Sequence, residues 1–264
     1  MRLLREKITD ERVIRLIGRY LRAGVWVAGK VEQVQGNKGT PQGGPLSPLL
    51  ANIYLDVLDK ELERKGLSFV RYADDCNIYV GSQKAAERVL KATVRFIEKK
   101  LKLEVNDRKS GTDRPWKRKY LGYQIREDGQ IGVSPSSLKK FRMKVRELWD
   151  GQANGKSNEL RDRWKRYVVG WWNYYQLAEA RRDLQKQEDP WIRRHIRKCF
   201  WTRWHKKQGR RNALSRLGLK GRALDPAGSS KGAWRMARSW TMQAALKNRT
   251  LKRFGFQCLS DLMG

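Results

Sequence analysis

The sequence predicts an α+β fold, with antiparallel hairpins packed on helices followed by an all-helical region. Short β-rich runs joined by turn residues occur only before residue 134. Apolar residues recur at helical spacing in both halves, and the composition changes near residue 134. We therefore predict two domains, residues 1–133 and residues 134–264.

The charge predicts a polyanionic partner. The 264 residues include 59 Lys and Arg against 27 Asp and Glu, a formal charge of +32. Residues 134–264 hold most of the excess, with 32 basic and 10 acidic side chains. These basic residues are interleaved with Trp and Tyr instead of forming one short cluster, which favours nucleic acid over a membrane surface.

The cysteines and the hydropathy pattern predict a cytoplasmic protein. The three cysteines are scattered and form neither a disulfide framework nor a zinc-binding pair, which indicates a reducing compartment. No apolar run approaches the length of a membrane span, and no secretory signal opens the chain. We expect no membrane partner.

The first elements follow from helix and turn signals. Residues 10–23 predict an amphipathic helix that begins at Asp10, and residues 25–34 alternate loosely, as a strand pair does. Gly and Pro predict a loop over residues 39–47, and Ser47 is expected to cap a helix that reaches residue 65. The apolar face of the first helix is expected to contain Val13, Ile14, Ile17, Tyr20 and Leu21.

Residues 69–80, FVRYADDCNIYV, predict a hairpin with Asp74-Asp75 at its two-residue break. Such breaks favour Asn-Gly or Asp-Gly, because positive φ is then cheap. Two adjacent carboxylates repel each other, and a site for hard divalent cations would reverse that penalty. A solvated acidic turn is the alternative for the dipeptide alone.

The next elements complete the first domain. Ser82 is expected to cap a helix that runs through Leu101, and residues 101–105 alternate as a strand. A polar turn that carries Lys109 follows. Asp128-Gly129 then predicts a last hairpin over residues 120–133.

After residue 134 the periodicity is helical. Asp189-Pro190 is expected to cap the third helix, residues 205–233 to form loops, and the C-terminal end to fray. Helices are expected over residues 136–149, 158–176, 189–200 and 234–247.

The order of these elements fits nucleotidyl transfer, in which metal ions hold a triphosphate and the protein supplies carboxylates. Asp74 and Asp75 suit that role, and Lys109 could meet a leaving pyrophosphate. Glycines let backbone approach a base or sugar closely in the loop formed by Pro41, Gln42, Gly43 and Gly44. Taken singly, that loop could be an ordinary connector and Lys109 a solvated lysine.

Together these segments resemble the reverse transcriptases encoded by bacterial group II introns, the intron maturases. The resemblance is carried by GTPQGGPLSPLLANIYL (39–55), RYADD (71–75), LKLEVNDRKS (101–110) and KYLGYQI (119–125), in that family's order. The stretch WKRYVVGWWNYYQLA (164–178) is similar to the family's maturase-specific domain.

The resemblance implies a partial right-hand polymerase palm followed by a helical thumb and maturase domain. It implies Asp74 and Asp75 as catalytic ligands of Mg²⁺, with two ions in the complete enzyme. The implied partners are group II intron RNA, an RNA template with a DNA primer, and dNTPs. The implied substrate-binding residues are Pro41, Gln42, Gly43 and Gly44 at the nucleotide, Tyr72 and Ala73 at the primer end, Lys109 at the triphosphate, and Leu121, Gly122 and Tyr123 in the primer-gripping loop.

One departure concerns the beginning of the chain. The family's palm uses a further aspartate from a strand upstream of the glycine-rich loop, and the early acids here are Glu6, Asp10 and Glu11. Asp10 stands in a helix-cap context. We therefore expect an N-terminally incomplete member that polymerises poorly by itself, because two metal ions need carboxylates from more than one strand.

The basic half predicts RNA contacts of its own. Phosphate neutralisation can combine with stacking of unpaired bases on aromatic rings. Trp164, Trp171 and Tyr175 share one helical face and are assigned to packing. The aromatic residues left as candidates for stacking are Trp172, Tyr174, Trp191, Trp201 and Trp204.

Two functions compete. The first is an RNA-directed DNA polymerase with a maturase function in splicing. The second is a non-catalytic RNA-binding splicing cofactor that keeps the fold. A basic scaffold that merely coats nucleic acid explains the charge, but it explains neither the glycine loop nor the paired aspartates.

Overall fold

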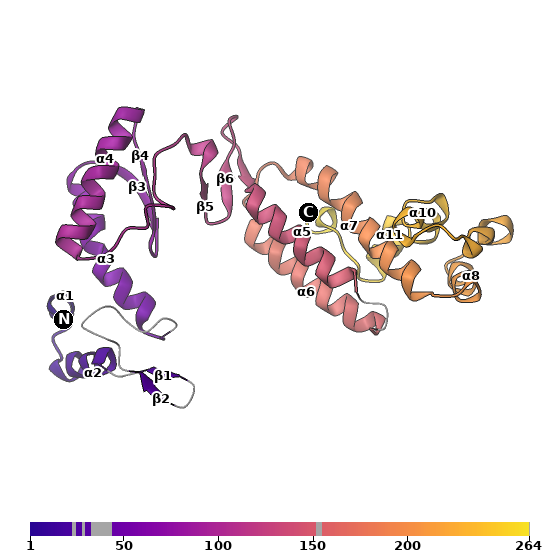
Figure 1. Cartoon of the computed structure of the whole chain (residues 1–264), viewed down its shortest axis with the longest axis horizontal. Coiled ribbons are helices and arrows are strands. Elements are labelled where there is room, and N and C mark those ends of the chain that lie inside the picture. Colours follow the sequence, from indigo (N-terminus) through magenta and orange to yellow (C-terminus); the bar gives the residue numbers. More distant parts are fainter. Residues whose placement is uncertain (23–24, 28–29, 33–43, 152–154, 264) are drawn as a thin grey trace. The chain divides into compact units, whose positions relative to one another are not determined.

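The computed structural model describes residues 1–22, 25–27, 30–32, 44–151 and 155–263 (Figure 1). It combines helices with small antiparallel sheets, as the α+β prediction requires. The chain forms two compact units, Met1–Asp113 and Arg114–Gly264, and each is described by itself. The division into domains at residue 133 stays a prediction.

The first unit alternates helices with two hairpins. Strands β1 and β2 pair antiparallel, as do β3 and β4. Its elements are α1 Arg2–Arg5, α2 Glu11–Arg22, β1 Val25–Val27, β2 Lys30–Glu32, α3 Ser47–Arg64, β3 Ser68–Tyr72, β4 Asp75–Tyr79, α4 Gln83–Phe96 and the π-helix η1 Ile97–Leu101.

Local capping fixes most helix starts in this unit. Asp10 Oδ1 accepts from the Arg12 amide at 2.8 Å, and Ser82 Oγ accepts from the Ala85 amide at 3.2 Å, so both predicted caps are confirmed. Ser47 is instead the first residue of α3, after Leu46, and makes no cap. Val13 is exposed whereas its neighbour Ile14 is buried, because adjacent positions of a helix face different directions.

A small core holds α3 against the second hairpin and the end of α4. Leu58, Leu62 and Leu101 are buried together, and the Tyr54 hydroxyl donates to the Leu101 carbonyl at 2.6 Å. The strand expected over residues 101–105 is absent from the described structure. Lys102 adopts φ +56°, a left-handed conformation that ends the helix, and the residues after Lys102 pair with no strand of the described structure.

The second unit begins with a three-stranded antiparallel sheet in the order β5-β6-β7. Gly129 takes φ +83° in the predicted Asp128-Gly129 turn between β6 and β7. Its elements are η2 Pro115–Lys117, β5 Lys119–Tyr120, β6 Tyr123–Ile125, β7 Ile131–Val133, α5 Pro135–Trp149, α6 Ser157–Tyr175, α7 Arg181–Arg203, α8 Lys207–Arg216, η3 Gly221–Gly228, α9 Ala233–Met236, α10 Trp240–Ala245, α11 Asn248–Arg253 and η4 Leu259–Asp261.

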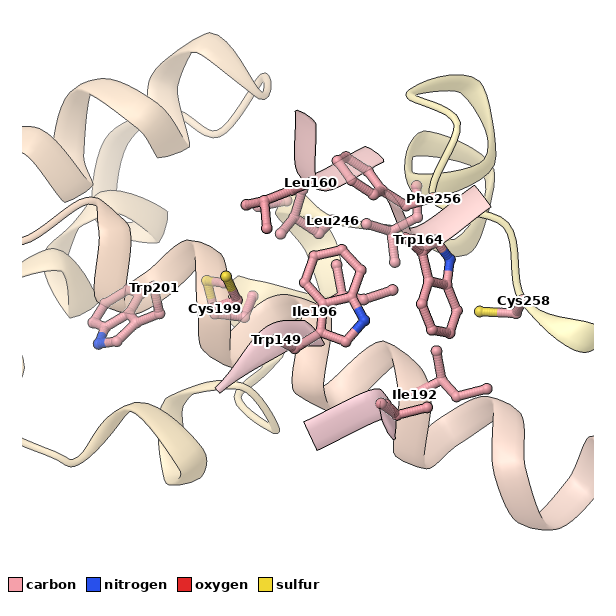
Figure 2. Packing of buried hydrophobic residues seen from close by; sticks show 14 of the residues in the cluster. Trp149, Leu160, Trp164, Ile192, Ile196, Cys199, Trp201, Leu246, Phe256 and Cys258 are labelled. Carbon is pink, nitrogen blue, oxygen red and sulfur yellow. The ribbon is translucent and has the colours of Figure 1, made fainter. Parts of the chain in front are cut away.

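A tryptophan-rich core joins these helices (Figure 2). Trp149 on α5 and Trp164 on α6 are buried with ring centroids 5.6 Å apart, and Ile196 on α7 is buried in the same cluster. The Trp164 indole donates to the Gln257 carbonyl at 2.7 Å, which satisfies its one polar group. This core therefore includes the C-terminal segment.

Four predictions for this unit are wrong. Helix α7 begins at Arg181 and continues through Pro190, so Asp189 does not cap it. Residues 205–233 contain α8 and η3 instead of loops alone, and the last predicted helix is split into α9 and α10. The C-terminal segment does not fray, since Leu259 is fully buried.

The Asp189 side chain caps the C-terminal segment and does not cap helix α7. Its buried carboxylate accepts from the amides of Leu259 at 3.0 Å and Ser260 at 3.3 Å, which caps η4 from a distant part of the chain. The Asp-Pro pair predicted a local cap, but its aspartate supplies a long-range one. Sequence spacing cannot distinguish a local cap from a long-range cap.

Candidate active site

The hairpin β3-β4 carries the paired aspartates. Tyr72 pairs with Asp75, so the two-residue turn is Ala73-Asp74, one position earlier than predicted. Ala73 takes φ +51°, the left-handed conformation that such a turn requires. Glycine or asparagine adopts this conformation at little cost, and other residues do not. Tyr72, Ala73, Asp74 and Asp75 are all exposed at this end of the hairpin.

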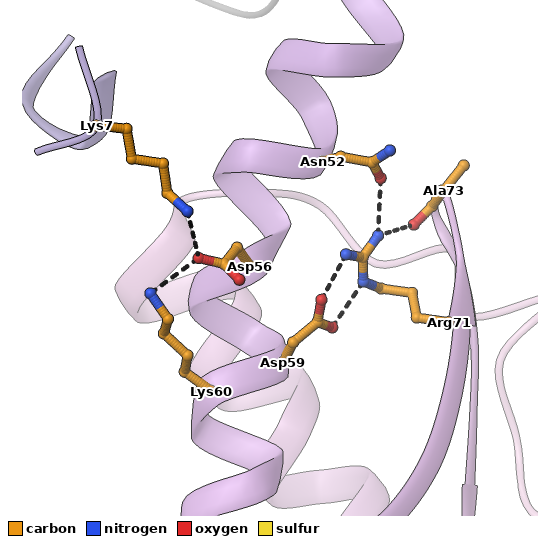
Figure 3. A network of polar contacts seen from close by, with 7 residues as sticks. All are labelled: Lys7, Asn52, Asp56, Asp59, Lys60, Arg71 and Ala73. Atoms are coloured by element: carbon orange, nitrogen blue, oxygen red, sulfur yellow. Dashed lines mark hydrogen bonds and ion pairs between the residues drawn. The ribbon is translucent and has the colours of Figure 1, made fainter. Parts of the chain in front are cut away.

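One arginine fixes this turn to helix α3 (Figure 3). The Arg71 guanidinium donates to both carboxylate oxygens of Asp59, at 2.7 and 2.5 Å, and to Asn52 Oδ1 at 3.0 Å. It also donates to the Ala73 carbonyl at 2.8 Å. The hydrogen bonds with Asp59 raise the pKa of Arg71, and the opposing effect of burial is smaller.

Sequence reasoning missed Asn52 and Asp59. They are seven residues apart, so they lie on one face of α3. That spacing, close to a predicted strand that carries an arginine, was the sequence signal that could have identified them. Helix α3 begins directly after the glycine-rich loop. The same helix therefore starts at the predicted nucleotide loop and holds the predicted metal-binding turn.

The carboxylates of Asp74 and Asp75 make no hydrogen bond or ion pair with the described residues. Mg²⁺ is often held through one or two carboxylates, with waters and substrate phosphates completing its shell. The pair fits as part of such a donor set. Over the described ranges, no group of three or more His, Cys, Asp or Glu side chains could hold a metal ion.

Gly44 is the described part of the predicted nucleotide loop, and Pro41, Gln42 and Gly43 lie outside the described residues. A Cβ atom on Gly44 would overlap the Tyr20 hydroxyl and lie 2.9 Å from Ser47 Oγ. Only glycine fits there without a shift of Tyr20. Close packing of the Tyr20 side chain therefore favours glycine at this position, whatever the loop binds.

Lys109 lies in the predicted polar turn. Its backbone amide donates to the carbonyl and the side-chain oxygen of Asn106, at 3.0 and 3.2 Å, and its side chain is exposed. The side chain of Gln83 donates to Thr112 at 3.0 Å, which ties this segment to the start of α4. No described contact joins Lys109 to Asp74 or Asp75.

The predicted primer-gripping residues form a second tight turn, in the other unit. Leu121 and Gly122 take φ +50° and +80° between β5 and β6. The Tyr174 hydroxyl on α6 donates to the Leu121 carbonyl at 3.0 Å. A Cβ atom on Gly122 would lie 2.5 Å from the Tyr175 hydroxyl, so helix α6 packs directly on this turn.

Tyr123 completes that contact. Its hydroxyl donates to the Tyr174 carbonyl, and its ring lies 5.2 Å from that of Tyr175. Burial raises the pKa of Tyr123, so the phenol stays protonated and able to donate. Two neighbouring tyrosines of the WWNYY stretch thus hold the turn formed by residues 121–123.

The candidate stacking aromatics divide by burial. Trp172 and Trp201, which the sequence left as candidates, are buried and belong to the core. Trp191 and Trp204 are half-buried, and Tyr174 remains exposed.

In the described part of the chain, no helix is long and apolar enough to cross a membrane.

Comparisons with known proteins match both parts of the chain. Residues 3–125 match the reverse transcriptase (RNA-dependent DNA polymerase) family. Residues 138–218 match the group II intron maturase-specific domain. The chain is a homologue of group II intron proteins. Its two matched regions follow each other in the order that the sequence motifs predicted.

Curated relatives agree with this assignment. The group II intron-encoded protein LtrA of Lactococcus lactis subsp. cremoris is 30% identical over 192 residues, covering 47% of this chain and 31% of the relative. The retron Ec86 reverse transcriptase of Escherichia coli is 29% identical over 146 residues, covering 53% and 42%. The chain thus spans less than half the length of these relatives.

Proposed function

We propose that this homologue of group II intron proteins is the palm and thumb portion of an RNA-directed DNA polymerase that also assists intron splicing. The observation that carries the proposal is the Arg71 bridge, which connects the exposed Asp74-Asp75 turn to the helix that follows the glycine-rich loop. A merely solvated acidic turn needs no such support from a neighbouring helix.

Each site residue has a role in this proposal. Asp74 and Asp75 would hold Mg²⁺, which when bound activates the primer hydroxyl and stabilises the charge on the triphosphate. Arg71 orients their turn. The nucleotide loop would consist of Pro41, Gln42, Gly43 and Gly44, the primer contacts of Tyr72, Ala73, Leu121, Gly122 and Tyr123, and the triphosphate contact of Lys109.

The partners follow from the two matched domains. We propose that the chain binds an RNA template with a DNA primer and dNTPs through residues 1–125, and group II intron RNA through the basic helices after residue 134. The formal charge of +32 supports a polynucleotide partner.

Primer extension on an RNA template with Mg²⁺ tests catalysis. We expect Asp74→Asn to lower the rate by at least about 100-fold, since a metal ion supplies several kcal/mol of charge stabilisation. Asp107→Asn, an exposed acid of the same unit, is the matched control and should extend normally. Measurable extension at the same rate by Asp74→Asn and by the unchanged chain would refute the metal role.

A non-catalytic splicing cofactor is the second candidate. It is favoured by the absence, over the described ranges, of a third acidic ligand beside the paired aspartates. In that case the unchanged chain would bind intron RNA and promote splicing without extending any primer. The same preparation can be assayed for both activities, so the two candidates give different results.

A further inference from the structure

Tyr54 connects helix α3 to the end of the π-helix η1. Its hydroxyl donates to the Leu101 carbonyl at 2.6 Å, and the Leu101 side chain is buried against Leu58 and Leu62. Leu101 is the last residue of η1, and the last carbonyls of a helix have no partner within it. A hydrogen bond from α3 and the core therefore both fix the point at which the chain leaves η1.

The segment that carries Lys109 begins at this point. Lys102 takes φ +56°, and the Leu103 amide donates to the Ile97 carbonyl at 3.2 Å. A left-handed residue at a helix end turns the chain away from the helix. The direction in which the segment leaves is thus set beside the carbonyl that Tyr54 holds.

The segment itself has few other supports. Residues 104–111 are exposed except for the half-buried Val105. Their hydrogen bonds are internal, from the Lys109 and Ser110 amides to Asn106. No hydrogen bond of the described structure joins these residues to another element. The local turn can therefore form without fixing where Lys109 lies.

Two anchors remain, one at each end of the segment. Tyr54 holds Leu101 at the beginning, and the side chain of Gln83 donates to Thr112 Oγ1 at 3.0 Å at the end. The second anchor comes from the start of α4 and the first from α3. The position of Lys109 depends on both.

Helix α3 also holds the Asp74-Asp75 turn, because its Asp59 accepts from Arg71. Tyr54 precedes Asp59 by five positions, so at 3.6 residues per turn the two side chains leave the helix in different directions. One rigid helix thus supports the turn that is proposed to bind Mg²⁺ and, on another face, the segment with the lysine that is proposed to contact the triphosphate.

We propose that Tyr54 is a positioning residue for the contact between Lys109 and the incoming triphosphate. The inference rests on the proposed polymerase function, since it concerns a lysine of that site. Without the Tyr54 hydroxyl the segment keeps its internal turn but leaves η1 in a wider range of directions. The substrate must then order the segment when it binds, which lowers its affinity.

Hydrogen exchange of the full chain tests the anchor. Tyr54→Phe keeps the ring and removes the hydrogen bond, so the peptide that covers residues 101–105 should exchange about 5-fold faster. The peptide that covers residues 58–64 should be unchanged. Tyr79→Phe is the matched control, because Tyr79 is 40% exposed against 39% for Tyr54 and its hydroxyl has no hydrogen bond with the described residues.

Protection of Lys109 by a nucleotide tests the positioning. The full chain would be assembled with Mg²⁺ on an RNA template and a DNA primer that ends in a dideoxynucleotide, so that the next paired dNTP binds without reacting. Labelling with an amine reagent, measured by mass spectrometry, gives the dNTP concentration that halves the reactivity of Lys109. That concentration should rise about 5-fold in Tyr54→Phe and stay the same in Tyr79→Phe. Lys91, an exposed lysine of α4, is the reference amine.

The outcomes are distinct. Faster exchange at residues 101–105 together with a raised concentration for half-protection supports the positioning role. An equal concentration in Tyr54→Phe and the unchanged chain would overturn that role and leave Tyr54 as a helix cap alone, and unaltered exchange would overturn it as well. If dNTP does not protect Lys109 even in the unchanged chain, the triphosphate contact of Lys109 is refuted, and the positioning role falls with it.

Discussion

Arg71 joins a strand, a turn and a helix through a single guanidinium. Its side chain and that of Asp59 are only 11% and 20% exposed, so the pair is shielded from water on most sides. A planar guanidinium that donates to both carboxylate oxygens restrains the geometry as well as adding energy. The position of the Asp74-Asp75 turn therefore depends on a residue that is neither a predicted ligand nor a predicted substrate contact.

The first prediction concerns this bridge. Arg71→Gln should lower the free energy of unfolding of the first unit by about 2–3 kcal/mol. The substitution removes several charge-assisted hydrogen bonds and leaves the half-buried Asp59 carboxylate without its guanidinium partner. Urea denaturation followed by circular dichroism measures it. Arg64→Gln, which breaks an exposed pair with Glu61, should cost much less, because water screens exposed ion pairs. Similar losses in the two variants would contradict the bridging role.

His195 is a residue whose environment was not evident from the sequence. Its ring lies between Trp191 and Trp234, with centroids 4.4 and 4.8 Å away, and its Nδ1 lies 2.9 Å from an Asp150 oxygen. Burial lowers the pKa of His195, against the opposing effect of Asp150, and the charges of Lys198 and Arg146 act in the same direction as burial. The folded protein therefore favours the neutral imidazole.

The second prediction follows from that sign. Below the ordinary histidine value of 6.5 the unfolded chain takes up a proton that the folded chain resists, so stability should fall as the pH drops from about 7 toward 5.5. His195→Gln should lose this part of the pH dependence. Thermal unfolding at a series of pH values, followed by tryptophan fluorescence, measures both. A steeper loss of stability in the variant would contradict the argument.

At the scale of elements, the turn of residues 121–123 and helix α6 form one structural piece. The turn comes from the region matched to reverse transcriptases, and α6 from the maturase-specific match. Tyr174 and Tyr175 contact it from consecutive positions, through a hydrogen bond to the Leu121 carbonyl and close packing on Gly122. A change in α6 should therefore be transmitted to the turn.

The third prediction tests that connection. Tyr174→Phe keeps the ring and removes the hydrogen bond to Leu121, a loss of about 1 kcal/mol. Hydrogen exchange of the peptide that covers residues 119–125 should become about 5-fold faster. Tyr79→Phe, at an exposed tyrosine of the first unit, is the control and should leave that peptide unchanged. Unaltered exchange in Tyr174→Phe would show that the ring packing alone holds the turn.

At the scale of the whole molecule, the two units have unequal cores. The cluster in the first unit buries Leu58, Leu62 and Leu101, whereas the second unit buries several tryptophans and most of its aliphatic residues. Stability grows with the apolar area removed from water. Two units with separate cores need not unfold together.

The fourth prediction is a two-step unfolding in urea. The first unit should lose its structure at the lower urea concentration. Ten of the eleven tryptophans belong to the second unit, so tryptophan fluorescence reports mainly on that unit while circular dichroism reports on both. The circular dichroism transition should therefore begin before the fluorescence transition. Coincident curves would indicate a single cooperative unit instead.

Much of the fold and part of the site were predictable from local patterns. Asp10 and Ser82 cap their helices, and the hairpins at residues 69–80 and 120–133 form where alternation and turn residues indicated. The strand at 101–105 failed because alternation over five residues predicts a strand only when a partner strand is available. The tryptophans stayed open in the sequence because helical spacing does not distinguish a buried ring from a stacking one.

By itself the sequence determined the resemblance to group II intron proteins, the order of the two matched regions and the presence of the paired aspartates, because motifs, charge and turn residues are properties of neighbouring positions. Only the tertiary structure decided that Arg71 reaches Asp59, that Asp189 caps the C-terminal segment and that Trp172 and Trp201 belong to the core. These contacts join residues distant in the chain. Their partners are chosen by geometry, which no local pattern records.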